Sequence, residues 1–342
     1  MESDTLTSKQ LHFIVERNIP YIHGALEPFG TVEYLDPESI TPDTVRHADA
    51  LIVRTRTRCN AQLLEGSTVK FIATATIGTD HIDMDWCHSH GITVANAPGC
   101  NAPAVAQYVL ASIASLANRP VSQYRLGIVG VGNVGRIVEK WALSMGMDVM
   151  LCDPPRQRAE GGSRWHTLDQ LAAACDVITF HTPLTHTGPD ATYHLADDAF
   201  FNSLSRSPII INAARGPIVD TPALTAAIKT GKVFQAVIDT WENEPHPDPE
   251  LMAYTAIATP HIAGYSSEGK LRATRMALDA VSKFFGLPPI SFRDDRRTPV
   301  AERVSVPRLL WTYDPLADDQ ALRENPEDFE ALRNNYRLRH EP

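Results

Sequence analysis

A glycine-rich segment in the middle of the chain constrains the fold most strongly. Gly130, Gly132 and Gly135 form a complete GxGxxG pattern, with Asn133 and Val134 between the last two glycines. The pattern follows an apolar, strand-like segment and precedes a segment with helical periodicity. In that context the glycines permit a tight turn and a close approach of the backbone to a pyrophosphate, while the helix N-terminus supplies N–H groups to the anion. The segment therefore predicts a dinucleotide-binding β-α-β unit.

The ends of the next two predicted strands indicate which dinucleotide is bound. Asp153 closes the segment DVMLCD, at the position where an acid accepts hydrogen bonds from the adenosine ribose hydroxyls. A carboxylate there repels a 2′-phosphate, so we expect NAD rather than NADP, with nearby Arg156 opposing that preference. Thr182 follows the strand DVITF and is expected to contact the nicotinamide half of the cofactor. His181 beside it is equally well explained as an ordinary loop histidine.

The pattern of strands and helices extends this unit to two α/β domains. Short apolar runs rich in β-branched residues alternate with segments compatible with helices, which is typical of parallel sheets with helical crossovers. We expect two doubly wound, Rossmann-like α/β domains with an active-site cleft between them, and helices over about 102–118 and 266–286. The expected division is a substrate-binding domain at 1–104 and 265–290, an NAD-binding domain at 105–264, and a small C-terminal region at 291–342. The predicted strands lie at 11–16, 49–55, 70–76 and 92–98, then at 125–130, 148–153, 176–181, 208–213, 234–239 and 256–260.

Composition argues against several other classes of protein. The formal net charge of −10 argues against a broad nucleic-acid surface. The apolar runs fall far short of the ~20 residues that span a bilayer, and the polar N-terminus MESDTLTSKQ is not a secretory signal. Five dispersed cysteines without CxxC spacing indicate reduced, packed thiols of a cytoplasmic protein. We therefore expect no membrane, nucleic-acid or metal partner.

Three residues at the exits of later strands supply the groups that an alcohol oxidation requires. His261 follows AIATP, and an imidazole, with an ordinary pKa of about 6.5, can exchange a proton near neutral pH. Glu244 can orient one imidazole tautomer and stabilise the imidazolium. Arg215 follows PIIINA, and its planar guanidinium can hold a substrate carboxylate through two hydrogen bonds. Each residue alone has an ordinary interpretation as a loop residue, but together they predict oxidation of a 2-hydroxy acid.

These segments resemble the D-isomer specific 2-hydroxyacid dehydrogenase family over roughly residues 11–290. The family's catalytic trio is an arginine, a glutamate and a histidine in this order. The resemblance implies that Arg215 and Glu244 are active-site residues and that His261 is the proton donor and acceptor. It also implies further contacts. The cofactor contacts are Asp153, Thr182, Ala213, Ala214, Arg215, Asp239 and Gly264, and the substrate contacts are Thr55, Thr76 and Tyr265.

Four other segments narrow the resemblance to one branch of that family. They are FIATATIGTDHID (71–83), NAPGCNA (96–102), CDPPR (152–156) and HIAGYSSEGK (261–270). They resemble the members that oxidise a phosphorylated four-carbon sugar acid on the route to pyridoxal 5′-phosphate. We therefore expect a phosphorylated small-molecule hydroxy acid as the substrate.

A phosphorylated substrate requires cations, and the C-terminal tail carries a further resemblance. The candidate cations are Arg54, Arg56, Arg58 and Lys270, which the sequence does not rank, and the RTRTR run is equally compatible with a solvated loop. In the tail, Asn325-Pro326 predicts the start of a helix that continues through FEALRNNYRLR, residues 329–339. This segment resembles the family's dimerisation region, which implies a homodimer.

Two other interpretations stay open at this point. A dehydrogenase of another 2-hydroxy acid, such as 3-phosphoglycerate, hydroxypyruvate or glyoxylate, would carry the same trio. A dehydrogenase-like NADH sensor acting as a transcriptional corepressor would share the fold, but such proteins carry disordered arms that this sequence lacks. How the cofactor is re-oxidised and how far the two domains close are not encoded in any motif.

Overall fold

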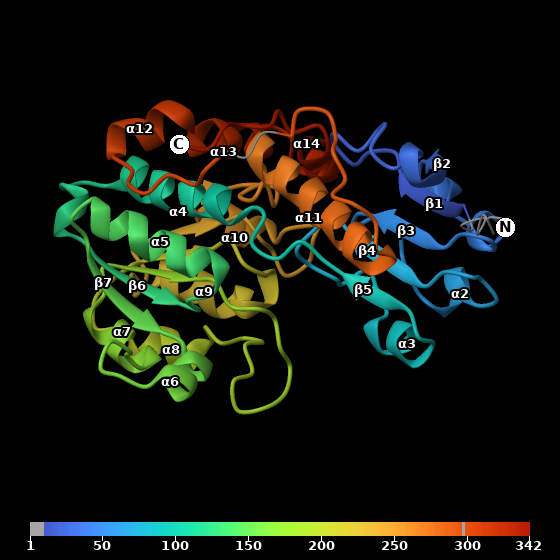
Figure 1. Ribbon diagram of the computed structural model, residues 1–342. Helices are drawn as coiled ribbons and strands as arrows, with labels where there is room; N and C mark the ends of the chain where they lie inside the picture. Colours follow the sequence, from blue (N-terminus) through green and yellow to red (C-terminus); the bar gives the residue numbers. More distant parts are fainter. Residues whose placement is uncertain (1–9, 296–297) are drawn as a thin grey trace, which may run out of the picture. The chain divides into compact units, whose positions relative to one another are not determined.

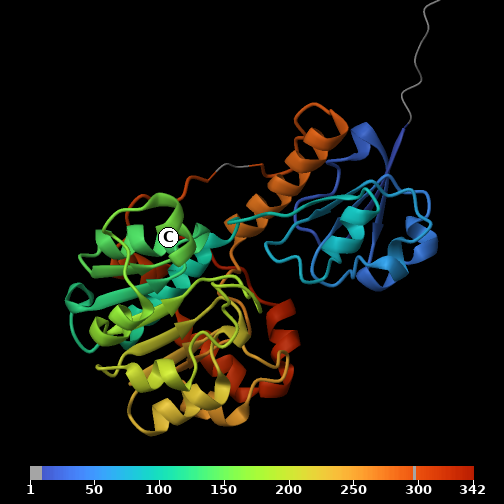
Figure 2. The ribbon, with the colours of Figure 1, turned by 90° about the horizontal axis from the view of Figure 1, so that it is seen from below.

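The computed structural model describes residues 10–295 and 298–342, which form two compact α/β units. The first unit covers the chain up to Asn101 together with Glu268–Thr298, and the second covers Ala102–Ser267 and Pro299–Pro342. Each unit is a twisted parallel sheet with helices on its faces, as Figures 1 and 2 show. The predicted fold of two Rossmann-like parallel-sheet domains is thus confirmed. The polar segment 1–9 lies outside the described residues.

The first unit is built on a five-stranded sheet with the order β2-β1-β3-β4-β5, in which all neighbours are parallel. Phe13 and Val15 pack on the face covered by α11, and Ile14 packs on the face covered by α1, α2 and α3. This alternation is the period of two expected for a strand buried on both faces. The elements are β1 (Leu11–Glu16), β2 (Gly30–Leu35), β3 (Ala50–Val53), β4 (Phe71–Thr74), β5 (Thr93–Ala95), α1 (Pro42–Val45), α2 (Ala61–Leu64), α3 (Met84–Ser89) and α11 (Ser267–Phe285).

Strand β2 is absent from the predicted strands although the other four are present. It is an edge strand that pairs only with β1 among the described strands, and its residues Thr31 and Glu33 are exposed. Glu33 accepts a hydrogen bond from the ring of His12 at 2.7 Å. The polar outward face hides the strand, because a sequence pattern recognises a buried strand by its apolar run.

The second unit is built on a six-stranded parallel sheet with the order β11-β10-β9-β8-β6-β7. All six predicted strands are present. From β7 the chain returns to β8, which pairs with β6 on the opposite side, so the C-terminal end of β6 is a topological switch point where α/β sheets bind ligands. The strands are β6 (Arg125–Val129), β7 (Asp148–Cys152), β8 (Val177–Phe180), β9 (Ile209–Asn212), β10 (Gln235–Ile238) and β11 (Ile257–Ala258).

Helices cover both faces of this sheet. On one face α4 and α5 lie side by side and α12 packs against α4 (Figure 1). Helix α4 is buried from Ala102 to Ile113, as expected for a helix that is apolar almost all round. The elements are α4 (Ala102–Leu116), α5 (Asn133–Ser144) and α12 (Val306–Thr312) on this face, and α7 (Leu168–Ala174), α8 (Asp198–Ser203), α9 (Thr221–Lys229) and α10 (Pro249–Tyr254) on the other, with α6 (Pro154–Glu160) after β7.

The C-terminal tail packs within the second unit and differs from the prediction. It forms α12, α13 (Pro315–Glu324) and α14 (Phe329–Asn334), and its residues Leu309, Leu322 and Phe329 are fully buried. The predicted helix through residue 339 is too long, because the chain leaves the helix after Asn334 and Arg339 instead pairs with Ser266 in a β-bridge. The prediction missed α12 and α13. Within the described residues, no helix has both the length and the apolar character needed to cross a membrane.

Candidate active site

The turn between β6 and α5 lies at the topological switch point. Gly130 has a φ of +88°, and an added Cβ would approach the carbonyl carbon of His181 to 2.7 Å, so no other residue fits without strain. Gly132 immediately precedes α5, and a Cβ added there would meet open space. Gly132 has no side chain to cap the helix, so the first N–H groups of α5 receive no cap from it. Space beside an uncapped helix N-terminus is the arrangement that binds a pyrophosphate.

The remaining residues of the predicted glycine motif begin α5. Asn133, Val134 and Gly135 are its first three residues. A Cβ on Gly135 would lie 2.1 Å from the carbonyl oxygen of Gly130. The third glycine therefore permits the close packing of helix and turn that the motif predicts.

Asp153 follows β7 and borders the glycine turn. Its Oδ2 accepts a hydrogen bond from the N–H of Val131 at 2.8 Å, and its Oδ1 accepts one from the N–H of Arg156 at 3.0 Å. The side chain thus caps α6 and fixes the glycine turn at the same time. The residue is only half-buried, and a carboxylate has about four acceptor positions. Asp153 therefore retains the capacity to bind ribose hydroxyls.

Thr182 follows β8 and lies against Gly130. Its hydroxyl oxygen is buried and makes no hydrogen bond to any described residue. A buried polar group without a partner costs about 1–3 kcal/mol, so this hydroxyl can gain a hydrogen bond from a polar ligand group. The orphaned hydroxyl, the open space at Gly132 and the accessible carboxylate of Asp153 fit a dinucleotide cofactor.

His181 has a structural explanation of its own. Its Nε2 lies 3.0 Å from the hydroxyl of buried Thr179, and its backbone N–H donates to Val129. Burial lowers the pKa of His181 to about 3. The ring is therefore neutral at any working pH and is not a candidate acid.

Arg215 follows β9 in a loop that packs closely on the loop after β10. A Cβ added to Gly216 would lie 1.9 Å from the carbonyl oxygen of Trp241, so glycine is required for the two loops to meet. Arg215 donates from Nη1 to the carbonyl of Ala214 at 2.8 Å. Ala213 and Ala214 lie half-buried in the same loop. The glycine thus brings the Arg215 loop against the segment that leads to Glu244.

The predicted carboxylate–imidazole pair is formed. His261 Nδ1 lies 2.8 Å from Glu244 Oε2, and Glu244 Oε1 accepts a hydrogen bond from the N–H of Trp241 at 2.9 Å. His261 has a φ of +56°, which is uncommon outside glycine and clusters at functional sites. Its backbone N–H donates to the carbonyl of Asp239 at 2.9 Å. The residue is therefore fixed both through its ring and through its backbone.

The electrostatics of Glu244 favour the ionised carboxylate. Burial by itself would raise the pKa of Glu244, but the hydrogen bond and charge of His261 oppose burial. The N–H of Trp241 and the charge of Arg333 act in the same direction as His261, and the net effect lowers the pKa. An ionised carboxylate at Nδ1 leaves Nε2 as the ring nitrogen that could exchange a proton with a ligand.

Asp239 stabilises the loop that carries His261. It is 1% exposed and accepts hydrogen bonds from the hydroxyl of Thr259 at 2.7 Å and from the N–H groups of Ile262 at 2.7 Å and Ala263 at 3.0 Å. Burial raises the pKa of Asp239 more than His261 and these donors lower it. The carboxylate therefore shapes the turn that carries His261, and its predicted contact with the cofactor stays a prediction. Gly264 lies in the same turn.

The predicted substrate residues fall in both units. Tyr265 belongs to the second unit, and Thr55 and Thr76 follow β3 and β4 of the first unit. The hydroxyl of Thr76 donates to the carbonyl of Gly78 at 3.0 Å, while Thr55 is exposed. The candidate cations Arg54, Arg56, Arg58 and Lys270 also belong to the first unit. Within the described residues, no three His, Cys, Asp or Glu side chains gather to hold a metal.

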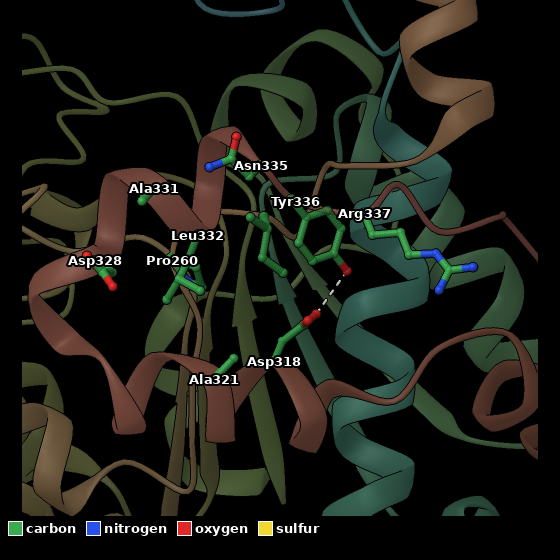
Figure 3. Close-up of a pocket in the computed structure, with 10 residues that line it drawn as sticks. Pro260, Asp318, Ala321, Asp328, Ala331, Leu332, Asn335, Tyr336 and Arg337 are labelled. Atoms are coloured by element: carbon green, nitrogen blue, oxygen red, sulfur yellow. Dashed lines mark hydrogen bonds between the residues drawn. The ribbon is translucent and has the colours of Figure 1, made fainter.

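The tail brings two arginines to the loop after β11 that the sequence analysis did not assign to the site. Arg333 lies 3.8 Å from Glu244 Oε2, and Arg339 donates to the carbonyl of Ile262. The only available signal was their position in FEALRNNYRLR, which the resemblance assigned to dimerisation. A cavity of about 390 Å³ lies between the tail and this loop, with Pro260 and Ile262 in its wall (Figure 3). None of the predicted cofactor or substrate residues lines that cavity.

Comparison with known proteins places this geometry in a family. The model of the D-isomer specific 2-hydroxyacid dehydrogenase NAD-binding domain matches residues 106–263. Erythronate-4-phosphate dehydrogenase from Bacteroides thetaiotaomicron is 47% identical over 97% of both chains. The Yersinia enterocolitica enzyme of that name is 38% identical over 97% of this chain and 93% of its own. D-lactate dehydrogenase from Aquifex aeolicus, complexed with NAD and lactic acid, has the same fold, with a TM-score of 0.67, 24% identity and coverage of 80% and 95%.

The chain therefore belongs to the D-isomer specific 2-hydroxyacid dehydrogenases and is an NAD-dependent dehydrogenase. Within that class it belongs to the erythronate-4-phosphate dehydrogenase family. The resemblance read from the sequence is confirmed at both levels.

Proposed function

We propose that this protein oxidises 4-phospho-D-erythronate to (R)-3-hydroxy-2-oxo-4-phosphooxybutanoate in pyridoxal 5′-phosphate synthesis. The observation that carries the proposal is the distance of 2.8 Å between His261 Nδ1 and Glu244 Oε2. Both residues follow strands of the sheet that contains the topological switch point. The names of the relatives at 38–47% identity support the choice of substrate.

In this reaction His261 acts as the base. Glu244 holds Nδ1, so Nε2 takes the proton of the C2 hydroxyl as the C2–O bond becomes a carbonyl. The C2–H bond breaks with its electron pair, and NAD, when bound, accepts it as hydride. The ionised Glu244 stabilises the imidazolium that results. In the reverse direction the same imidazolium returns the proton to the oxygen.

Arg215 binds the substrate carboxylate in this proposal. Its guanidinium stands at a strand exit, and the contact of Gly216 with Trp241 fixes its loop beside the one that carries Glu244. A bidentate contact to the C1 carboxylate would orient C2 toward His261 and polarise the developing carbonyl. Thr55, Thr76 and Tyr265 are proposed as further substrate contacts.

The test is a comparison of substrates under initial-rate conditions with NAD. We expect kcat/KM for 4-phospho-D-erythronate to exceed that for 3-phosphoglycerate, glycolate and lactate by at least about 100-fold. A site that hydrogen-bonds a polar group of its substrate rejects analogues that lack this group. Faster oxidation of 3-phosphoglycerate would contradict the proposed substrate while leaving the dehydrogenase class intact.

We also infer that the protein is a cytoplasmic homodimer. Helix α12 exposes Leu310 and Trp311, the latter to 77%, and α13 exposes Leu316, which supports a covered apolar surface on the tail. All five cysteines are free and buried, which supports a reducing compartment. Sedimentation of Trp311→Glu should give a monomer, whereas Tyr254→Glu, an exposed aromatic on α10, should sediment like the wild type. A monomeric wild type would contradict the inference.

A further inference from the structure

Arg333 extends the pair of Glu244 and His261 into a chain of three ionisable groups. Its Nη1 lies 3.8 Å from Glu244 Oε2, and that same oxygen lies 2.8 Å from His261 Nδ1. The guanidinium is also hydrogen-bonded to the side chain of Tyr265. Arg333 and His261 Nδ1 therefore approach the same carboxylate oxygen of Glu244.

The three side chains are shielded enough from solvent for a charge on one of them to affect the others. The side chains of Arg333 and Glu244 are each 21% exposed, and that of His261 is 29% exposed. Partly buried charges are screened by salt far less than exposed ones. The groups that face Glu244 are His261 and Arg333, and those that face Arg333 are Glu244, Tyr265 and Glu330, whose Oε1 lies 3.7 Å away.

A second arginine fixes the tail to the turn that follows His261. Arg339 is 8% exposed, and its Nη1 donates to the carbonyls of Ile262 and Tyr265, each at 3.1 Å. Its Nη2 donates to the carbonyl of Ala263. Its backbone carbonyl accepts from the N–H of Ser267 at 3.0 Å. These contacts anchor the segment that carries Arg333 against the segment that carries His261.

We propose that Arg333 is a positioning residue for the reaction, which holds the Glu244 carboxylate against His261 Nδ1 and holds the side chain of Tyr265 beside them. The tail thereby completes the acid–base site within a single chain. The inference rests on the proposed function only in that it takes Glu244 and His261 as the acid–base pair. The FEALRNNYRLR segment would then position the acid–base pair in addition to its proposed role in dimerisation.

The test compares Arg333→Ala, Arg333→Lys and the control Arg337→Ala by full kinetics. Arg337 is an exposed arginine of the same segment, so its removal should leave kcat within about twofold. Arg333→Ala should lower kcat about 10- to 100-fold with the Kd for NAD unchanged, because a misplaced acid–base group loses that order of rate. Arg333→Lys should recover part of the loss, since it restores the charge without the planar contact.

The pH profile separates positioning from mere folding. Arg333→Ala removes a positive charge that lies 3.8 Å from Glu244 Oε2. Loss of a nearby positive charge favours protonation of the Glu244–His261 pair, so the acid limb of kcat/KM should move to higher pH, and Arg333→Lys should move it back. An unchanged kcat and acid limb in Arg333→Ala would overturn the proposal. A rise of more than tenfold in substrate KM at unchanged kcat would also overturn it, by making Arg333 a substrate contact.

Loss of folding in Arg333→Ala would leave Arg333→Lys and NAD binding as the deciding measurements. In that case Arg333→Lys, which keeps the charge, should fold and retain the kcat and the acid limb of the wild type. Arg333→Gln, which keeps hydrogen bonding but not the charge, should shift the acid limb of kcat/KM. An unshifted limb in Arg333→Gln contradicts the proposal. Because every ratio is taken on whichever 2-hydroxy acid the wild type oxidises, failure of the proposed substrate shows in the wild type and failure of this inference shows in the variants.

Discussion

Two aspartates at strand exits of the same sheet end in different environments. Asp153, after β7, is half-buried and accepts two backbone hydrogen bonds beside the glycine turn. Asp239, after β10, is 1% exposed and accepts three hydrogen bonds around the turn that carries His261. The position after a strand therefore determines where a carboxylate lies, but not which groups it binds. Burial and neighbouring donors decide whether it faces a ligand or holds the backbone.

The same contrast separates the two ends of the site. At the cofactor end, one short segment supplies the glycine turn and the N-terminus of α5, and Thr182 from the loop after β8 packs against Gly130. At the proton-transfer end, the residues come from three separate segments: Asp239 and Glu244 from the loop after β10, His261 from the loop after β11, and Arg333 from α14. The first end depends on local backbone geometry, and the second depends on tertiary structure. Substitutions at the two ends should consequently separate cofactor binding from chemistry.

The largest effect is expected for His261→Ala. Loss of the base should lower kcat about 1,000-fold, while the Kd for NAD, measured by calorimetry, changes less than about threefold because the cofactor end is untouched. Stopped-flow absorbance of NADH gives kcat. Loss of NAD binding together with turnover would show that cofactor binding and proton transfer do not depend on separate parts of the site.

The next largest effect is a loss of stability in Asp239→Ala. The substitution leaves the N–H groups of Ile262 and Ala263 without their acceptor and removes one of the two hydrogen-bond partners of the Thr259 hydroxyl, which keeps Tyr108. The expected cost is about 3 kcal/mol in the free energy of unfolding. Urea denaturation of the cofactor-free protein measures it. The control Asp169→Ala, at an exposed position of the same unit, should stay within about 0.5 kcal/mol of the wild type. Equal stability of the two variants would show that Asp239 does not hold the loop.

The third effect concerns the choice of cofactor by Asp153. Serine at this position still caps α6 but removes the charge that repels a 2′-phosphate, so Asp153→Ser should lower the ratio of kcat/KM for NAD over NADP about tenfold or more. Asp148→Ser, at the exposed start of β7, is the matched control. An unchanged ratio in Asp153→Ser would mean that the ribose is recognised by another residue.

The smallest effect is a pH dependence of stability that arises from His181. The folded pKa is lowered to about 3 by burial, below the unfolded value of about 6.5, so only the unfolded chain binds the proton between these values. Stability is therefore full above pH 6.5 and falls as the pH drops below it, by roughly 1 kcal/mol at pH 5.5. Urea midpoints of the wild type and His181→Gln at pH 7.5 and 5.5 measure it, and a variant that retains the full pH slope excludes His181 as its source.

Features that depend on local sequence could be predicted, whereas features that depend on tertiary contacts could not. Every strand of the two sheets except β2, the glycine turn, and the pair of Glu244 and His261 could be predicted, because each has a local pattern or a fixed place at a strand exit. Strand β2 could not, because its exposed face is polar. Arg333 and Arg339 could not, because the site residues that they contact are remote in sequence and an arginine in a helical tail has no distinguishing local signal.

The most direct test of the central claim follows the hydrogen at C2. The wild type is incubated with 4-phospho-D-erythronate carrying deuterium at C2 and with NAD, and the NADH formed is examined by mass spectrometry. We expect one deuterium per NADH and a slower hydride-transfer step than with unlabelled substrate, since the C2–H bond breaks as His261 takes the hydroxyl proton. NADH without deuterium, or no NADH at all, would contradict the account.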